Sequence, residues 1–109
     1  NICQEISVNQ KYKDKTYSAK QLAKDLGTNT RYISTVINRQ FNTNYTSFVN
    51  KFRIQEAMKL LKDKRKAHLT IEDVSDAVGF STRQSFYTSF KRFTGMTPRE
   101  YRISPESDR

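Results

Sequence analysis

The sequence contains few of the residues that disulfides, metal sites and β-turns require. One cysteine, Cys3, and one histidine, His68, occur among its 109 residues, so neither an internal disulfide nor a zinc site with the usual ligand set is expected. Three glycines and two prolines leave few turn positions, which favours an all-helical fold. No apolar run of about 18 residues is long enough to span a membrane. No charged segment followed by an apolar core marks a secretion signal.

Signatures of catalysis are missing as well. We find no paired nucleophile and base, no set of metal ligands and no glycine-rich phosphate loop, so an enzyme is the least favoured class and no cofactor is expected. The net charge of +9 favours a polyanionic partner, although solvated lysine-rich surfaces give the same balance in many proteins. The length fits one domain or two small subdomains. Because the chain begins with Asn1, we expect it to be a piece of a longer protein.

Residues 70–101 show the pattern of two short helices on either side of a Gly-Phe-Ser turn. Thr70 and Asp73 have the spacing of a capping box, and Gly79 supplies a left-handed position to end the first helix. Ser81 and Gln84 have capping-box spacing at the start of the second helix. The expected buried stripes are Ile71, Val74 and Val78 in the first helix, and Phe86, Phe90 and Phe93 in the second. Two short helices joined by a tight glycine turn indicate a helix-turn-helix.

A second unit of the same kind occupies residues 18–42. Ser18 and Gln21 have capping-box spacing, Gly27 is expected to end the first helix, and Asn29 is a good N-cap for the second. The residues expected to face inward are Ala19, Leu22, Ala23, Leu26, Ile33, Val36 and Ile37. The sequence therefore predicts two helix-turn-helix units.

The two units align as an internal repeat, with an offset of 52 residues before the turn and 53 after it. One inserted residue in the second turn accounts for the change. The matched pairs are Ser18 with Thr70, Leu22 with Val74, Leu26 with Val78, Gly27 with Gly79, Ile33 with Phe86, Ile37 with Phe90, Asn42 with Gly95 and Phe48 with Tyr101. The chain thus carries two copies of one structural device.

A linker helix is expected over residues 44–64, which contain no glycine or proline. Its apolar residues fall on two sides, Tyr45, Phe48, Val49 and Phe52 on one and Ile54, Ala57, Met58 and Leu61 on the other, so we expect it to pack on both units. A helix of about 20 residues is roughly 30 Å long, close to the roughly 34 Å of one turn of B-DNA. The two second helices would then enter successive major grooves.

The expected organisation is all-α, with about seven helices. A first subdomain spans 1–43 and includes a short helix within residues 1–11; the linker helix spans 44–64, and the second subdomain spans 65–103. Thr97, Pro98 and Glu100 have the pattern of a cap and first turn for the last helix. Residues 104–109 are expected to be a frayed tail.

Polar side chains occupy the face of each second helix that points away from its apolar stripe. In the second unit these are Arg83, Gln84, Tyr87, Thr88 and Lys91, and in the first they are Arg31, Ser34, Thr35 and Asn38. Donors and acceptors of this kind suit base-pair edges in a major groove. Arg83 could equally bond a phosphate, and Gln84 would be less free to read a base if it bonds back to Ser81.

Two segments resemble the DNA-binding domain of AraC/XylS-type bacterial transcription regulators. They are GFSTRQSFYTSFKRFTGMTPREYR (79–102) and FVNKFRIQEAMKLL (48–61), and the resemblance extends from about Lys11 to Ile103. It implies two helix-turn-helix units, joined by a linker helix, that bind an asymmetric DNA site through adjacent major grooves. Asn42 departs from the usual glycine, and Thr94 from the frequent aromatic residue. Because the polar side chains of the first unit are short apart from Arg31, that unit is a candidate for phosphate contacts alone.

The resemblance also implies the positions that contact bases. The base-contact candidates are Arg31, Ser34, Thr35, Arg83, Gln84, Tyr87 and Thr88. Other basic side chains are either contacts to the DNA backbone or plain solvated charges; these phosphate-contact candidates are Arg39, Lys51, Arg53, Lys91 and Arg92. For Arg53, a structural salt bridge is an equally good interpretation.

The expected partner is double-stranded DNA, with the isolated domain monomeric, the parent protein a candidate dimer and no membrane contact by this segment. The acidic stretch 70–78 carries Glu72, Asp73 and Asp76 and no basic residue, so we expect it to face away from DNA or towards a protein, for which RNA polymerase is the candidate. The expected location is the cytoplasm, on the nucleoid. Two other classes stay open: a basic helical adaptor for acidic proteins, and a non-specific or RNA-binding module.

Overall fold

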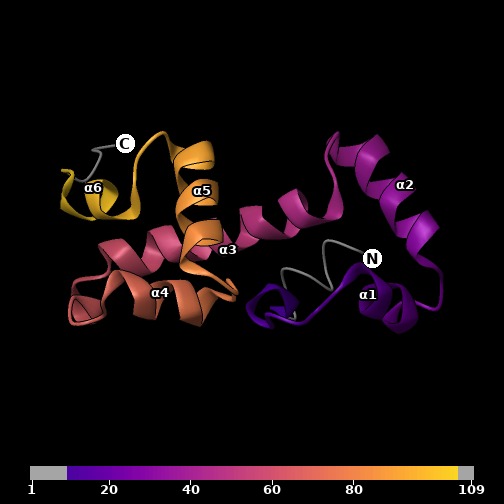
Figure 1. The fold of residues 1–109 in the computed structure, drawn as a ribbon, viewed down its shortest axis with the longest axis horizontal. Coiled ribbons are helices and arrows are strands. Elements are labelled where there is room, and N and C mark those ends of the chain that lie inside the picture. The colour runs from indigo at the N-terminus through magenta and orange to yellow at the C-terminus, as the bar shows by residue number, and fades with distance from the viewer. Residues whose placement is uncertain (1–9, 106–109) are drawn as a thin grey trace. The chain divides into compact units, whose positions relative to one another are not determined.

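The computed structural model describes residues 10–105, and all regular secondary structure in this part of the chain is helical, with no strand. Its elements are a 3-10 turn η2 (Lys11–Lys13), helices α1 (Ala19–Asp25), α2 (Thr30–Phe41) and α3 (Tyr45–Lys62), a 3-10 turn η3 (Lys64–Lys66), and helices α4 (Ile71–Val78), α5 (Arg83–Thr94) and α6 (Pro98–Ile103). In each half of the chain a short helix leads through a tight turn into a longer one (Figure 1). The all-helical prediction is confirmed. The helix expected within 1–11 and most of the tail expected at 104–109 lie outside the described residues.

Most helix boundaries follow from capping residues that are visible in the sequence. Thr70 and Asp73 form a reciprocal capping box at the start of α4, with both hydrogen bonds at 3.0 Å. Thr97 and Glu100 do the same for α6, with hydrogen bonds of 2.9 and 3.1 Å. Gly79 ends α4 with a φ of 104°, a left-handed conformation that glycine adopts without strain.

The predicted start of α5 is wrong by one residue. Thr82, not Ser81, is the N-cap, and its hydroxyl oxygen accepts a hydrogen bond from the Ser85 backbone N–H at 3.0 Å. Asn29 caps α2 in the same way, accepting from the Tyr32 N–H at 2.9 Å. Thr82 follows Asn29 by 53 residues, the same offset that relates the buried residues of the two helices.

The chain divides into two compact units, each of which contains one of the predicted helix-turn-helix units. The first unit ends at Phe52 and the second begins at Arg53, so the boundary falls inside α3. The core of the first unit combines α1, α2 and the first half of α3 with two tyrosines that precede α1. Its buried residues are Tyr12, Tyr17, Leu22, Ala23, Ile33, Ile37, Phe48 and Val49. The predicted apolar face of α3 at Phe48 and Val49 is therefore confirmed.

The core of the second unit combines the second half of α3 with α4 and α5. Its buried residues are Ile54, Ala57, Leu61, Val74, Val78, Phe80, Phe86 and Phe90. The predicted burial of Phe93 is wrong, because this side chain is 41% exposed. The centre of the Tyr101 ring lies 5.6 Å from the centre of the Phe90 ring, and Tyr101 packs against this core. Phe93, one turn further along α5, is not among the residues that pack against it.

Candidate nucleic-acid interface

The polar face of α5 is fixed by the two phenylalanines that anchor the helix. Phe86 and Phe90 are fully buried, and because successive residues are about 100° apart around a helix, Gln84 and Thr88 point to the opposite side. Both are exposed, and the Gln84 Nε2 group donates a hydrogen bond to Thr88 Oγ1 at 3.3 Å. Since Thr82 is the cap, Gln84 is not bonded back to Ser81 and belongs to the exposed face.

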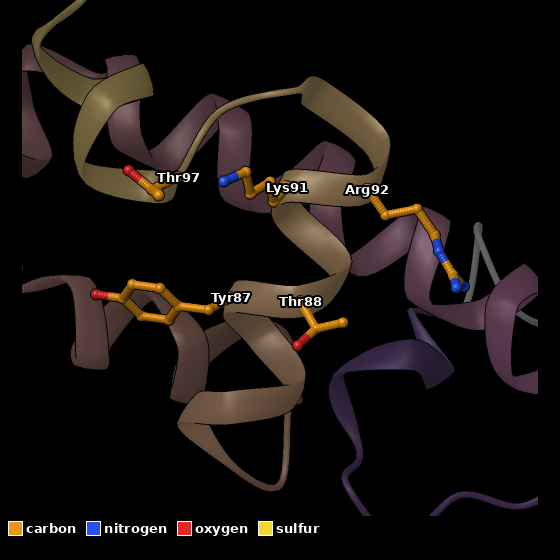
Figure 2. Close-up of a pocket in the computed structure, with 5 residues that line it drawn as sticks. All are labelled: Tyr87, Thr88, Lys91, Arg92 and Thr97. Carbon is orange, nitrogen blue, oxygen red and sulfur yellow. The ribbon is translucent and has the colours of Figure 1, made fainter.

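The candidates further along α5 lie on two flanks of this face. Figure 2 shows Tyr87 and Lys91 extending to one side of the helix and Thr88 and Arg92 to the other. Together with Thr97 these four side chains line an open hollow of about 430 Å³. The structure thus brings the base-contact candidates of α5 and two phosphate-contact candidates together on one accessible surface.

Arg83 occupies the first position of α5 and contacts two side chains. Its guanidinium carbon lies 5.3 Å from the centre of the Tyr87 ring, and Nη1 lies 3.6 Å from the Glu72 Oε2 atom on α4. Hydrogen bonding with Tyr87, and then the negative charge of Glu72, raise the pKa of Arg83 above its usual value, so the group is charged at any physiological pH. Arg83 and Tyr87 are therefore a contacting pair and not two independent candidates.

The contact with Glu72 was not predicted from the sequence. We expected the acidic stretch 70–78 to face away from DNA or towards a protein, and one of its carboxylates lies beside a base-contact candidate, Arg83. Glu72 and Arg83 are on different helices, so helical spacing gives no signal for their contact. Their side chains are 66% and 65% exposed, so the pair remains accessible to a ligand.

The candidates on α2 are exposed, because Ile33 and Ile37 hold the opposite side of this helix in the core. Arg31 and Ser34 are solvent-facing. The Thr35 hydroxyl donates a hydrogen bond to the Arg31 backbone carbonyl oxygen at 2.9 Å, which leaves Thr35 only its acceptor capacity. An aromatic residue that we did not predict as functional, Tyr32, is 56% exposed on the same helix; its placement among the polar residues of the helix was the available signal.

The phosphate-contact candidates outside α5 divide into two kinds. Arg39, in the last turn of α2, and Lys51, on α3, are exposed cations. Arg53 is half-buried, and its guanidinium carbon lies 5.6 Å from the centre of the Phe80 ring in the core of the second unit. The structure therefore gives Arg53 a packing contact within its own unit.

Two further properties concern the described residues, 10–105. Within this range no helix has both the length and the apolar character needed to cross a bilayer. In the same range, His, Cys, Asp and Glu side chains do not gather in groups of three or more that would hold a metal ion.

Comparison with known proteins gives a consistent result. The family described as "Helix-turn-helix domain" matches residues 22–104. The chain is 29% identical over 87 residues to the uncharacterized transcriptional regulatory protein YesN of Bacillus subtilis, covering 78% of this chain and 23% of that protein. It is 26% identical over 89 residues to the melibiose operon regulatory protein of Escherichia coli K12, covering 82% of this chain and 28% of that protein. The chain thus spans less than a third of either curated relative.

Solved structures show the same fold. The C-terminal domain of AraT, a response regulator from Geobacillus stearothermophilus, superposes with a TM-score of 0.79 at 26% identity, covering 96% of this chain and 86% of that one. The C-terminal domain of the response regulator yesN from Fusobacterium nucleatum gives a TM-score of 0.76 at 24% identity, covering 94% of this chain and 99% of that one.

Proposed function

The chain belongs to the AraC-type family of helix-turn-helix DNA-binding domains, and from this premise we propose that it binds double-stranded DNA sequence-specifically as part of a bacterial transcription regulator. The observation that carries the proposal is the repeated design of the two units. In each, a capped helix is held by a buried apolar stripe and leaves polar side chains exposed on its other side. An adaptor for acidic proteins or a non-specific binder would not require two matched polar faces.

Readout by α5 is proposed to rest on two contacting pairs. Gln84 suits bidentate recognition of an adenine, and Arg83 suits a guanine, because their donors and acceptors match those base edges in the major groove. The hydrogen bond from Gln84 to Thr88 supports this role, since it restrains the rotamers of a flexible side chain before DNA arrives. Tyr87 restrains Arg83 similarly by contact with its guanidinium group.

The first unit is proposed to bind through α2, with Arg31, Ser34 and Thr35 as the candidates for base contact. The cations Arg39, Lys51, Lys91 and Arg92 would bind phosphates and set the register of the protein on the duplex. Arg53, already in contact with Phe80, is retained only as a secondary phosphate candidate.

We further propose that the two units occupy successive major grooves. The repeat supports this arrangement, because each unit carries its own helix with an exposed polar face. In this proposal residues 1–43 and 65–103 are the two reading subdomains and 44–64 the linker helix. The domain would act as a monomer on DNA in the cytoplasm, without catalysis or a cofactor, within a parent protein that is a candidate dimer and has RNA polymerase as a candidate partner.

Selection of binding sites from randomised duplexes at physiological salt tests the proposal. Enrichment of a bipartite motif with half-sites about one turn apart is the expected result. Arg83→Ala should then cost about 1–3 kcal/mol at the selected site and relax the preference at one base pair. Arg65→Ala is a matched control, because it removes the same charge from a residue that is paired with Asp63 outside the candidate surface. Absence of enrichment would support the adaptor or non-specific alternatives, and a uniform loss in Arg83→Ala would make Arg83 a phosphate contact.

A further inference from the structure

We propose that Glu72 is a specificity-determining residue, whose carboxylate makes Arg83 favour an uncharged base edge over a phosphate. The inference deepens the proposed function of α5 and rests on it. Glu72 is not among the residues assigned to DNA contact, and it belongs to the other helix of the unit.

The geometry places an acid beside a reading cation on an open surface. The Glu72 Oε2 atom lies 3.6 Å from Arg83 Nη1, while the centre of the Tyr87 ring lies 5.3 Å from the guanidinium carbon. About two thirds of each charged side chain is exposed, so DNA can reach Arg83 without unfolding any element. A group that binds Arg83 is therefore in the electrostatic field of the nearby Glu72 carboxylate.

A phosphate and a base edge respond differently to that carboxylate. The phosphate carries a full negative charge, and two like charges about 4 Å apart in water repel each other by an energy equivalent to about fivefold in a binding constant. This value is an upper limit, because the repulsion falls with distance and with salt. The O6 and N7 atoms of guanine carry only partial charges and meet much less repulsion. Glu72 should therefore weaken binding of Arg83 to any phosphate and leave its binding to guanine nearly unchanged. Because non-specific affinity comes from phosphates, the result is higher selectivity.

The internal repeat shows that the fold does not require this acid. At the offset of 52, Lys20 corresponds to Glu72, and both occupy the second position of their helices. At the offset of 53, Thr30 corresponds to Arg83 and Ser34 to Tyr87. All three members of the cluster are thus replaced together in the first unit, which forms the same pair of helices without them. The contacts among Glu72, Arg83 and Tyr87 are therefore particular to the second unit, as a role in its own DNA readout requires.

The first experiment compares binding of the 109-residue chain to its selected duplex and to a scrambled duplex of equal length. For Glu72→Gln, we expect affinity for the scrambled duplex to rise by up to about fivefold, and by more than affinity for the selected duplex, which should rise by less than about twofold. The slope of log affinity against log salt on scrambled DNA should steepen by up to about one unit. Glu72→Lys introduces the residue type found at the matched position of the first unit, Lys20, and should lower selectivity further.

Glu56→Gln is the matched control, since it makes the same charge change on α3 in the same unit. It should alter binding to both duplexes equally. A second control introduces Glu72→Gln into the Arg83→Ala background. There Glu72→Gln should no longer lower selectivity, because Arg83 is absent. Unfolding curves followed by circular dichroism establish that each variant retains the fold of the parent chain.

The outcomes distinguish failure of the proposed role of Glu72 from failure of sequence-specific DNA binding. If Glu72→Gln raised the affinity for both duplexes equally, or had the same effect in the Arg83→Ala background, it would show only a general effect of net charge. That result would overturn the role of Glu72 and leave sequence-specific DNA binding in place. Lower affinity for the selected duplex with no gain on scrambled DNA would make Glu72 a support for base contact and also overturn the inference. If the parent chain fails to discriminate between the duplexes, the proposed function fails and the inference falls with it.

Discussion

Replacing Thr82 with alanine should destabilise the second unit by about 1 kcal/mol, whereas the same change at Ser81 should be nearly neutral. The Thr82 hydroxyl oxygen accepts a hydrogen bond from the Ser85 N–H at 3.0 Å, and it also lies 3.0 Å from the Ser85 hydroxyl oxygen. Loss of an N-cap usually costs about 0.5–2 kcal/mol. We place Thr82 near the middle of that range because the site is exposed and water can solvate the freed N–H.

Urea unfolding followed by helical circular dichroism measures both variants against the parent chain. With unchanged denaturant slopes, the midpoint should shift to lower urea for Thr82→Ala alone, and its melting temperature should fall by about 4 °C. Ser81→Ala is the natural control, since it removes a hydroxyl from the adjacent exposed position outside α5. If Ser81→Ala cost as much as Thr82→Ala, α5 would begin one residue earlier, and the orientation assigned to Gln84 would be wrong.

Three other predictions test the core, a helix end and the interface. Phe90→Ala should cost about 3–5 kcal/mol in a urea unfolding experiment, because this side chain is fully buried, while Phe93→Ala, at a site 41% exposed, should cost far less. Gly95→Ala should cost about 1–2 kcal/mol in the same assay, from its φ of 80° alone, since an added Cβ would meet nothing within 4 Å. Gly95→Asn should cost much less, because Asn42 adopts a φ of 53° at the matched position of the first unit. Titrations of the selected duplex should show affinity falling by roughly 10³ to 10⁵ between 50 and 200 mM salt if about six to ten phosphates are bound.

The fold was largely predictable because much of the information is local and occurs twice. A capping box depends on residues within one turn, and both predicted boxes with an acidic partner, at Thr70 and Thr97, are present. The start of α5 was missed because Ser81 and Gln84 also satisfy that local spacing. The repeat would have resolved the ambiguity, since Thr82 aligns with Asn29 at the offset of 53 residues that also aligns the buried residues of the two helices.

Contacts between elements were much less accessible from the sequence. Tyr12 lies in the charged segment 11–15 and was not among the residues expected to face inward, yet it is 5% exposed and its ring centre lies 6.2 Å from that of Phe52. The segment is too short for its periodicity to reveal an apolar side. Similarly, the positions of Glu72 and Arg83 in sequence gave no sign of their contact, because it depends on how α4 and α5 pack.

The two units are alike in fold but present different chemistry to a duplex, and this difference bears on how a site would be read. On α2 the Thr35 hydroxyl donates a hydrogen bond to the backbone of its own helix. Arg31 has the longest side chain of the three base-contact candidates on this helix. Lys20 then adds a cation at the position where Glu72 would repel phosphates in the second unit. The first unit is therefore suited to supply sequence-independent affinity, and α5, with its two contacting pairs, to supply discrimination. If this division holds, base substitutions should cost more in the half-site bound by α5 than in the half-site bound by α2.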